Sequence, residues 1–197
     1  MRVSGAKAKV DRAALDLFAA KGVDGVSIAE IAAAADVSQG ALYRHYRSKD
    51  ELAARLFSLA YRRTGAELAA LVAARSSFAA RVGAMVARFC ALYDHDAALF
   101  RFMLIAQHDL LPRDDGEGPT PVAAIEAAIV NAAAHGEVGA VDPAFGAAAI
   151  MGIVLQTALF HIYGHITGPL APRAPALARA AIAAVTALDP DRGESAG

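Results

Sequence analysis

Cysteine is nearly absent from this sequence, and the familiar catalytic signatures are missing altogether. The single Cys90 has no partner for an internal disulfide, and its apolar surroundings, VARFCALY, predict a buried side chain, with a redox-sensing thiol as the alternative. No GxSxG, P-loop, HExxH or paired-carboxylate spacing occurs, so the residues support no enzyme class. We therefore expect a protein that is not an enzyme and that needs neither a cofactor nor a metal.

Charge is missing from one long stretch, Pro143–Pro172, which contains no Asp, Glu, Lys or Arg. A membrane span is one interpretation, because a span needs about 20 consecutive apolar residues. Gln156, Thr157 and His161 interrupt the stretch, however, so a helix buried on every side in protein is the interpretation that we favour. The N-terminal MRVSGAKAK is basic but lacks the apolar segment of a signal peptide, and we expect a cytoplasmic protein.

Lysine is absent beyond position 49, and this reveals an uneven distribution of charge. Residues 1–63 carry 11 Lys+Arg against 7 Asp+Glu, whereas residues 64–197 carry 8 against 13. This distribution is expected when only the basic segment, residues 1–63, binds a polyanion and the acidic segment, residues 64–197, does not. Chance scatter of a few charges is the alternative explanation.

The sequence also lacks long alternating runs of β-branched residues, while alanine is abundant, and this predicts an all-α fold. Glycine and proline separate the periodic segments, and we expect about nine helices. Apart from two short helices within residues 26–49, they are expected at about residues 7–20, 49–75, 78–93, 97–111, 121–135, 143–163 and 175–188.

The two short helices carry the strongest local signals in the chain. Ser27 and Glu30 have the spacing of a capping box, in which each residue satisfies a backbone N–H of the other. Apolar residues then recur at helical spacing from Ile28 to Ala35, where small alanines allow a second helix to cross closely. Ser38 is placed to cap that second helix.

The second helix of this pair offers a polar face. Gln39, Tyr43 and Arg44 lie on or beside it, and His45, Arg47 and Lys49 follow at once. Such hydrogen-bond donors suit phosphates and the edges of bases, so the two short helices are predicted to form a DNA-binding helix-turn-helix. An ordinary pair of packed helices with a solvated face is the alternative.

The run GALYRHYRSKDEL, residues 40–52, resembles the signature SxGxLYxHFxSKxxL of the tetracycline-repressor (TetR) family of bacterial transcription regulators. The resemblance is close over residues 8–57 and extends loosely over the whole chain. One departure is Asp36, which stands where the family usually has Gly in the turn. Asp tolerates a left-handed backbone better than most residues, so the turn is expected to survive.

The resemblance implies a ligand-responsive transcription regulator, most simply a repressor that a small, mostly apolar inducer releases from a palindromic double-stranded DNA operator. It implies a DNA-binding domain at residues 1–50 and a ligand-binding and dimerisation domain at 51–190, followed by a disordered tail at 191–197. The residues that it places against bases are Ala29, Gln39, Gly40 and Tyr43. Those that it places against phosphates are Ser27, Ser38, His45, Tyr46 and Lys49.

An effector pocket is expected where large apolar side chains cluster in an otherwise alanine-rich domain, because alanine walls leave volume unfilled. Amides and histidines among them would supply polar contacts. The residues predicted to line this pocket are Phe89, Tyr93, Phe100, Met103, Gln107, His108, Met151, Gln156 and Phe160.

The last two predicted helices are apolar on more faces than a monomer of this size covers, which predicts a two-fold four-helix interface in a homodimer. The residues assigned to it are Ile150, Val154, Thr157, His161, Leu177, Ala180, Ala184 and Leu188. Completion of a monomer core is the alternative. His161 and His165 also have the spacing of a metal pair, but no third ligand is evident, and histidines satisfied within the fold are the favoured interpretation.

The sequence is also compatible with a second function. The chain would then be a helical small-molecule-binding protein or enzyme whose N-terminal motif is structural. The basic cluster at positions 43–49 and the basic N-terminal part favour the DNA-binding regulator.

Overall fold

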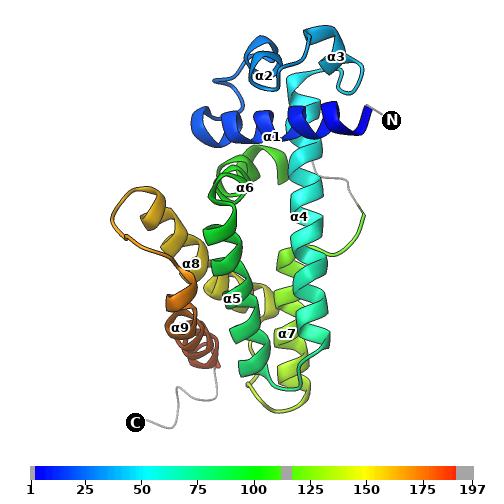
Figure 1. The fold of residues 1–197 in the computed structure, drawn as a ribbon. Coiled ribbons are helices and arrows are strands. Elements are labelled where there is room, and N and C mark those ends of the chain that lie inside the picture. The colour runs from blue at the N-terminus through cyan, green and yellow to red at the C-terminus, as the bar shows by residue number, and fades with distance from the viewer. Residues whose placement is uncertain (1–2, 112–116, 190–197) are drawn as a thin grey trace. The chain divides into compact units, whose positions relative to one another are not determined.

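The computed structural model describes residues 3–111 and 117–189, and over these residues the chain forms nine α-helices and no strand (Figure 1). The all-α prediction is confirmed, and the first helix begins earlier than the expected residue 7. The expected tail at 191–197 lies outside the described residues. In chain order the helices are α1 (Val3–Lys21), α2 (Ile28–Ala34), α3 (Gln39–Tyr43), α4 (Lys49–Ala73), α5 (Phe78–His95), α6 (Ala97–Leu110), α7 (Pro121–Ala134), α8 (Pro143–Ile162), the short 3-10 helix η2 (Ala171–Arg173) and α9 (Ala174–Ala187).

The described residues divide into two compact units. Unit 1 holds residues 3–61 and 96–111, and therefore contains α1, α2, α3, the first half of α4 and also α6. Unit 2 holds residues 62–95 and 117–189, with the rest of α4 and helices α5, α7, α8 and α9. This grouping differs from a division at residue 50, because α6 packs with the N-terminal helices rather than with its neighbours in sequence.

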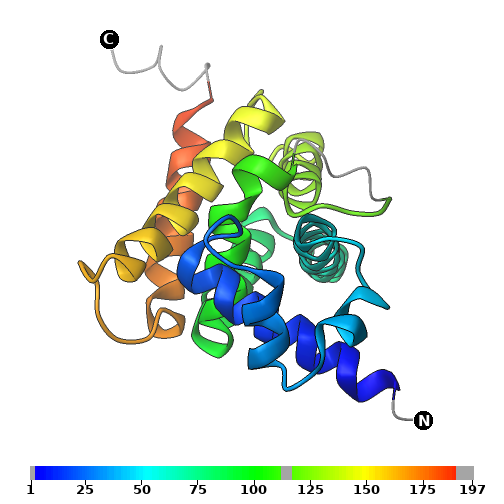
Figure 2. The same ribbon diagram turned by 90° about the horizontal axis from the view of Figure 1, so that it is seen from above.

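Unit 1 is built around α1, which packs against α2, α3 and α6. Figures 1 and 2 show α2 and α3 lying along one side of this helix. Val10, Ala14 and Phe18 recur at intervals of four along α1 and are each no more than 1% exposed. Phe102 of α6 stacks on Phe18 with the ring centroids 5.8 Å apart. The buried face of one amphipathic helix therefore forms the centre of this unit.

In unit 2, α5 packs against α7 and α9, and α8 packs against α7 and α9. Met85, Ile129 and Val185, from three of these helices, are fully buried. The start of α8 agrees with its sequence signal, since the Asp142 carboxylate accepts a hydrogen bond from the Phe145 N–H and proline occupies the first turn.

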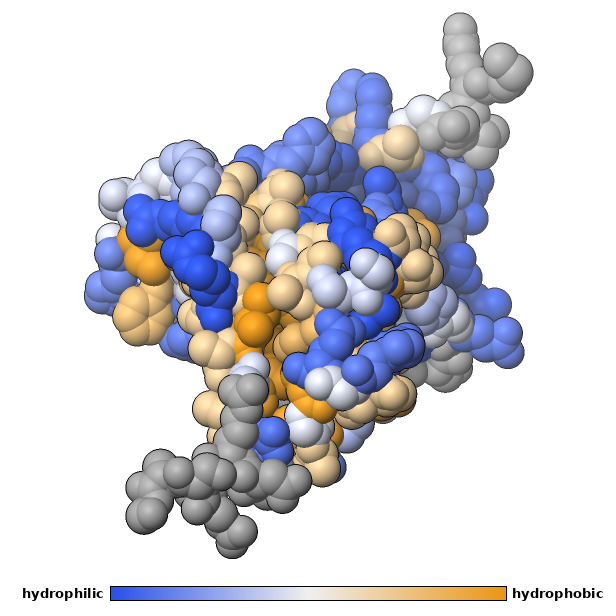
Figure 3. All heavy atoms as spheres, turned by 90° about the horizontal axis from the view of Figure 1, so that it is seen from below, coloured by the Kyte–Doolittle hydropathy of each residue, from blue (hydrophilic) through white to orange (hydrophobic). Residues whose placement is uncertain are grey.

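Apolar residues also reach the surface of unit 2. By length and composition alone α8 is apolar enough to cross a membrane, a test that core helices of other proteins also pass, and only 28% of its most apolar stretch is buried within the chain. The expectation of a helix buried on every side is therefore wrong for the single chain. Figure 3 shows apolar side chains gathered in a band between hydrophilic ones.

Candidate nucleic-acid interface

The start of α2 is held by the predicted capping box. The Ser27 hydroxyl oxygen accepts from the Glu30 N–H at 3.2 Å, and the Glu30 carboxylate accepts from the Ser27 N–H at 2.8 Å. Lys21 donates to the same carboxylate at 2.9 Å and, with the Ser27 N–H, lowers the pKa of Glu30 to about 2. The end of α1 and the start of α2 are thereby linked.

The turn between α2 and α3 depends on Asp36. Its φ is +54°, which makes it the one non-glycine residue of the described chain in the left-handed region. The Asp36 N–H donates to the Ala33 carbonyl at 3.2 Å, and the Val37 N–H donates to the Ala32 carbonyl at 3.0 Å. These bonds satisfy carbonyls at the end of α2 and confirm that Asp replaces the usual glycine without losing the turn.

The α3 helix presents one buried and one exposed face. Ser38 caps it by accepting from the Ala41 N–H at 3.2 Å, and Leu42 anchors its inner side with no exposed surface. Gln39, Gly40 and Tyr43 are exposed, Tyr43 by 53%, and so is Ala29 on α2. All four residues predicted to meet bases therefore lie at the surface of unit 1.

The predicted phosphate contacts lie around this face, with one exception. Ser27 and Ser38 are exposed at the starts of α2 and α3, and His45 and Lys49 are half-buried. The Lys49 ammonium group donates to the Asp24 carbonyl at 3.4 Å. Lys49 is also the first residue of α4, and the preceding Ser48 caps this helix, since its hydroxyl oxygen accepts from the Glu51 N–H at 3.0 Å.

Tyr46 is the exception, and its assignment to a phosphate is wrong. The side chain is only 2% exposed, and its hydroxyl donates to the Asp11 carboxylate at 2.5 Å. Lys7 donates to the other Asp11 oxygen at 2.6 Å, and its ammonium group lies 5.4 Å from the centre of the Tyr46 ring. Burial and the Asp11 carboxylate both raise the pKa of the Tyr46 hydroxyl.

This cluster attaches the segment after α3 to α1 and so holds the exposed face of α3 in place from its buried side. The sequence carried a signal for it, since Tyr46 follows the buried Leu42 by four residues and so shares its inward side. Asp11 lies 35 residues away and carried no such signal.

The predicted pocket residues are spread over both units. Phe100, Met103, Gln107 and His108 lie on α6 in unit 1, and the other five lie on α5 and α8 in unit 2. His108, Gln156 and Phe160 are exposed, so they do not line a closed cavity within a single chain. Phe89 and Tyr93 are buried in unit 2.

Unit 2 contains a different cavity, of about 470 Å³, between α4, α5 and α7. Alanines make up much of its wall, as expected for small side chains that leave volume unfilled. Arg81, which is only 7% exposed, and Asn131 are its polar members. The remaining lining residues are Ala69, Val72, Ala73, Pro119, Ala123, Ala124 and Ala127.

The residues predicted at a dimer interface are also divided. Ile150 and Val154 face the core of unit 2, with 1% and 4% exposed, and their assignment to an interface is corrected. Ala180 is exposed, and five others are half-buried: Thr157, His161, Leu177, Ala184 and Leu188. Large apolar side chains that were not assigned to the interface are instead exposed on α8 and directly after it: Phe145, Phe160 and Tyr163.

His161 and Cys90 are both accounted for within unit 2. The His161 Nε2 lies 2.7 Å from the Gly168 carbonyl, and its Nδ1 lies 2.9 Å from the Tyr93 hydroxyl. Both ring nitrogens are thus engaged, which agrees with the interpretation of a satisfied histidine. Cys90 is 2% exposed, and burial raises the pKa of its thiol to about 11, so it is a weak nucleophile as expected for a core residue.

Comparison with protein families matches residues 12–56 to the bacterial regulatory proteins of the tetR family. The matched segment runs from α1 into α4 and includes α2, the Asp36 turn and α3. Among curated proteins no match is found.

Solved structures share the fold over most of the chain. The regulator FadR from Bacillus subtilis in complex with stearoyl-CoA has a TM-score of 0.72 at 15% identity, covering 89% of this chain and 97% of its own. A tetR-family regulatory protein from Rhodococcus RHA1 has a TM-score of 0.72 at 22% identity, with 91% and 96% covered. A gamma-butyrolactone receptor, an ArpA-like protein, has 0.67 at 21% identity, with 92% and 100% covered.

Proposed function

The chain belongs to the tetR family of bacterial regulatory proteins, with that family's N-terminal domain at residues 12–56, and on this premise we propose that it is a ligand-responsive, sequence-specific DNA-binding transcription regulator. The observation that carries the proposal is the exposed face of α3, which a capped α2 and the left-handed Asp36 turn hold at the surface of unit 1. A repressor that releases its operator when an effector binds is the form that we propose.

The DNA contacts that we propose follow from exposure. Gln39 and Tyr43, with Ala29 and Gly40 beside them, meet base edges, because a long amide and a phenol offer donors and acceptors on the outer face. Ser27, Ser38, His45 and Lys49 contact phosphates, where hydroxyls, ring nitrogens and an ammonium group suit anionic oxygens.

Homodimerisation through α8 and α9 is the assembly that we propose. Phe145 on α8 and Tyr163 directly after its last residue are 62% and 64% exposed. Such large apolar side chains on and beside an uncharged helix favour a protein partner. Two copies would bring two α3 helices to one palindromic operator. A partner-covered α8 also supports a cytoplasmic protein over a membrane-anchored one.

We propose that the effector is a small, mostly apolar molecule bound in unit 2. The alanine-walled cavity between α4, α5 and α7 supports this, as do the stearoyl-CoA complex and the gamma-butyrolactone receptor among the structural neighbours. The effector would release the operator only through a difference in its affinity for the two states of the dimer.

A gel shift with DNA from upstream of the protein's own gene tests the function. The Lys49→Ala variant tests the proposed phosphate contact in the same assay. We expect binding that weakens with salt, and for Lys49→Ala a uniform loss across sequences with a salt slope reduced by about 1 per half-site. Arg63→Ala, which removes one exposed positive charge from the part of α4 that belongs to unit 2, is the matched control and should leave the slope unchanged. No binding at any salt concentration would contradict the proposal.

A further inference from the structure

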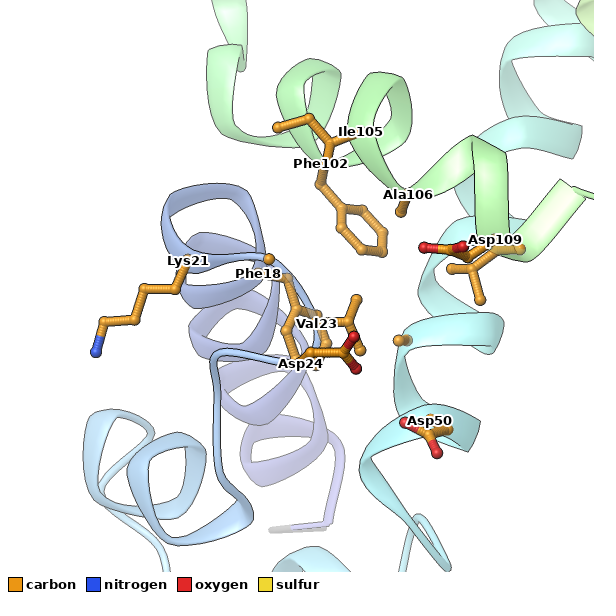
Figure 4. A pocket seen from close by; sticks show the side chains of 12 residues that line it. Phe18, Lys21, Val23, Asp24, Asp50, Phe102, Ile105, Ala106 and Asp109 are labelled. Carbon is orange, nitrogen blue, oxygen red and sulfur yellow. The ribbon is translucent and has the colours of Figure 1, made fainter.

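Unit 1 contains a cavity of its own, separate from the exposed face of α3. The end of α1, the turn that follows it, the first turns of α4 and the facing side of α6 enclose about 380 Å³ (Figure 4). This volume falls in the range of small-molecule sites, about 300–1,000 Å³. All of its lining residues belong to the same compact unit.

The inner wall of the cavity is aromatic and aliphatic. Phe18 and Phe102, stacked at 5.8 Å with 27° between the rings, form it and are each 1% exposed. Ala53 and Ala106 leave space beside them, and Ile105, which is 42% exposed, reaches the opening. Because the two rings are already buried, the apolar surface on which an aryl or alkyl group could replace water is that of Ile105 and of the half-buried Val23 and Leu110.

The outer part of the cavity is negatively charged. Asp24, Asp50 and Asp109 line it, and no salt bridge within the described part of the chain joins any of them to a cation. Lys21 also lines the cavity, but its ammonium group lies 2.9 Å from the Glu30 carboxylate and points away from the other lining residues (Figure 4). The Lys49 ammonium group, 3.4 Å from the Asp24 carbonyl, also lies beside Asp24, so the three carboxylates outnumber the two lysines near the cavity and favour a positively charged occupant.

The spacing of the carboxylates indicates which kind of cation fits. Among the described residues, no three His, Cys, Asp or Glu side chains are close enough to hold a metal ion. Carboxylates spread around an apolar wall instead complement a molecule that combines one positive group with a hydrophobic body.

We propose that this cavity of unit 1 is a binding site for a small amphipathic organic cation. Its aryl or alkyl body packs on Ile105, Val23 and Leu110, in front of the buried Phe18–Phe102 pair. Its ammonium group faces Asp24, Asp50 and Asp109. The site is distinct from the effector cavity proposed in unit 2, and the proposal does not depend on DNA binding.

Titration calorimetry and thermal melting of the full chain test the site with three probes of one shape. The probes are 4-phenylbutylamine, 4-phenylbutanol and 4-phenylbutyrate, which carry a positive charge, no charge and a negative charge. We expect the amine to bind one-to-one and raise the melting temperature, with the alcohol weaker and the carboxylate weakest. Added salt should weaken the amine and leave the alcohol unchanged. Equal binding of amine and alcohol, or no binding of the amine at millimolar concentration, would overturn the proposal.

Two substitutions of the exposed Asp109 locate the site. Asp109→Asn should weaken the amine about 2- to 5-fold, the range of one exposed ion pair, and Asp109→Lys should weaken it further while improving 4-phenylbutyrate. Glu126→Gln removes one negative charge from α7 in unit 2 and is the matched control, which should bind the amine like the wild type. Amine binding that Asp109→Lys leaves unchanged would show that the probe binds elsewhere, and the proposal would then be wrong.

Discussion

Single residues in the Tyr46 region show how one motif combines contact and support. Tyr43, exposed on α3, and Tyr46, buried behind it, lie three positions apart in the same signature. The first is available to a ligand, whereas the second bonds to Asp11 of α1. A motif match assigns both to the DNA interface, and only their burial distinguishes the two roles.

Replacing Tyr46 by Phe should weaken the attachment of this segment to α1. The change removes one hydrogen bond to a charged acceptor, and we expect a loss of about 1–3 kcal/mol in the free energy of unfolding, measured by urea denaturation. Tyr43→Phe removes a hydroxyl from a side chain of the same unit that is 53% exposed and is the matched control, with an expected change near zero in the absence of DNA. Equal stabilities of the two variants would contradict the supporting role of Tyr46.

Replacing Gln39 by Ala should relax base preference. We expect a loss of about 1–3 kcal/mol of discrimination at one base pair per half-site, because this long amide is proposed to pair with a base edge. In vitro selection of operator sequences measures the effect. Gln107→Ala, on α6, makes the same chemical change away from α3 and should leave the selected sequence as it is. An unaltered preference in the Gln39 variant would remove it from the readout.

At the scale of elements, short helices in unit 1 are defined by their ends. The α2 and α3 helices have seven and five residues, too few for stability from propensity alone, and caps at Ser27 and Ser38 supply partners for their first N–H groups. These capping serines were identifiable from sequence because capping is a local interaction. Glu30 also accepts a hydrogen bond from Lys21 at the end of α1, and this partner outside the capping box could not be identified from sequence.

The start of α2 should make the stability of unit 1 depend on pH. The pKa of Glu30 falls from an ordinary 4.5 to about 2 in the folded chain, so its stabilising contribution is complete above pH 4.5 and is lost as the pH falls through about 2. Glu30→Gln should therefore differ most from the wild type above pH 4.5 and converge with it near pH 2, as followed by urea unfolding. In a Lys21→Gln background the effect of Glu30→Gln on the free energy of unfolding should be smaller. If Glu30→Gln changes the stability of the otherwise wild-type chain by the same amount at every pH, this interpretation is contradicted.

At the scale of the whole molecule, α8 and α9 are the helices through which we propose that two copies assemble. Their outward side chains are mostly small or apolar, with Gln156 and Arg179 among the exposed polar exceptions. Within a single chain Phe145, Tyr163 and Ala180 are exposed. An interface through these two helices stays a prediction, and Ile150 and Val154 are corrected to core residues. Helical periodicity shows that a helix has several apolar faces, but only packing shows which one its own chain covers.

Introducing charge on the exposed side of α9 should separate the proposed dimer. Ala180→Glu would bury an unpaired carboxylate in the seam, so we expect a monomer at micromolar concentration by sedimentation and loss of tight operator binding. Ala80→Glu, at an exposed position in the first turn of α5, is the matched control and should leave the dimer intact. A wild type that sediments as a monomer, or an Ala180→Glu variant that remains a dimer, would refute this assembly.

The sequence by itself determined the features that depend on neighbours within about one helical turn. The all-α class, the caps at Ser27 and Ser38, the Asp36 turn and the Asp142 start of α8 all follow from residues at most a few positions apart, because helix periodicity and capping are local interactions. The tertiary structure alone decided the rest: the Tyr46–Asp11 bond, the inward side of α8 and the cavity between α1, α4 and α6. Each of these depends on which distant segments meet, and packing, rather than local pattern, selects them.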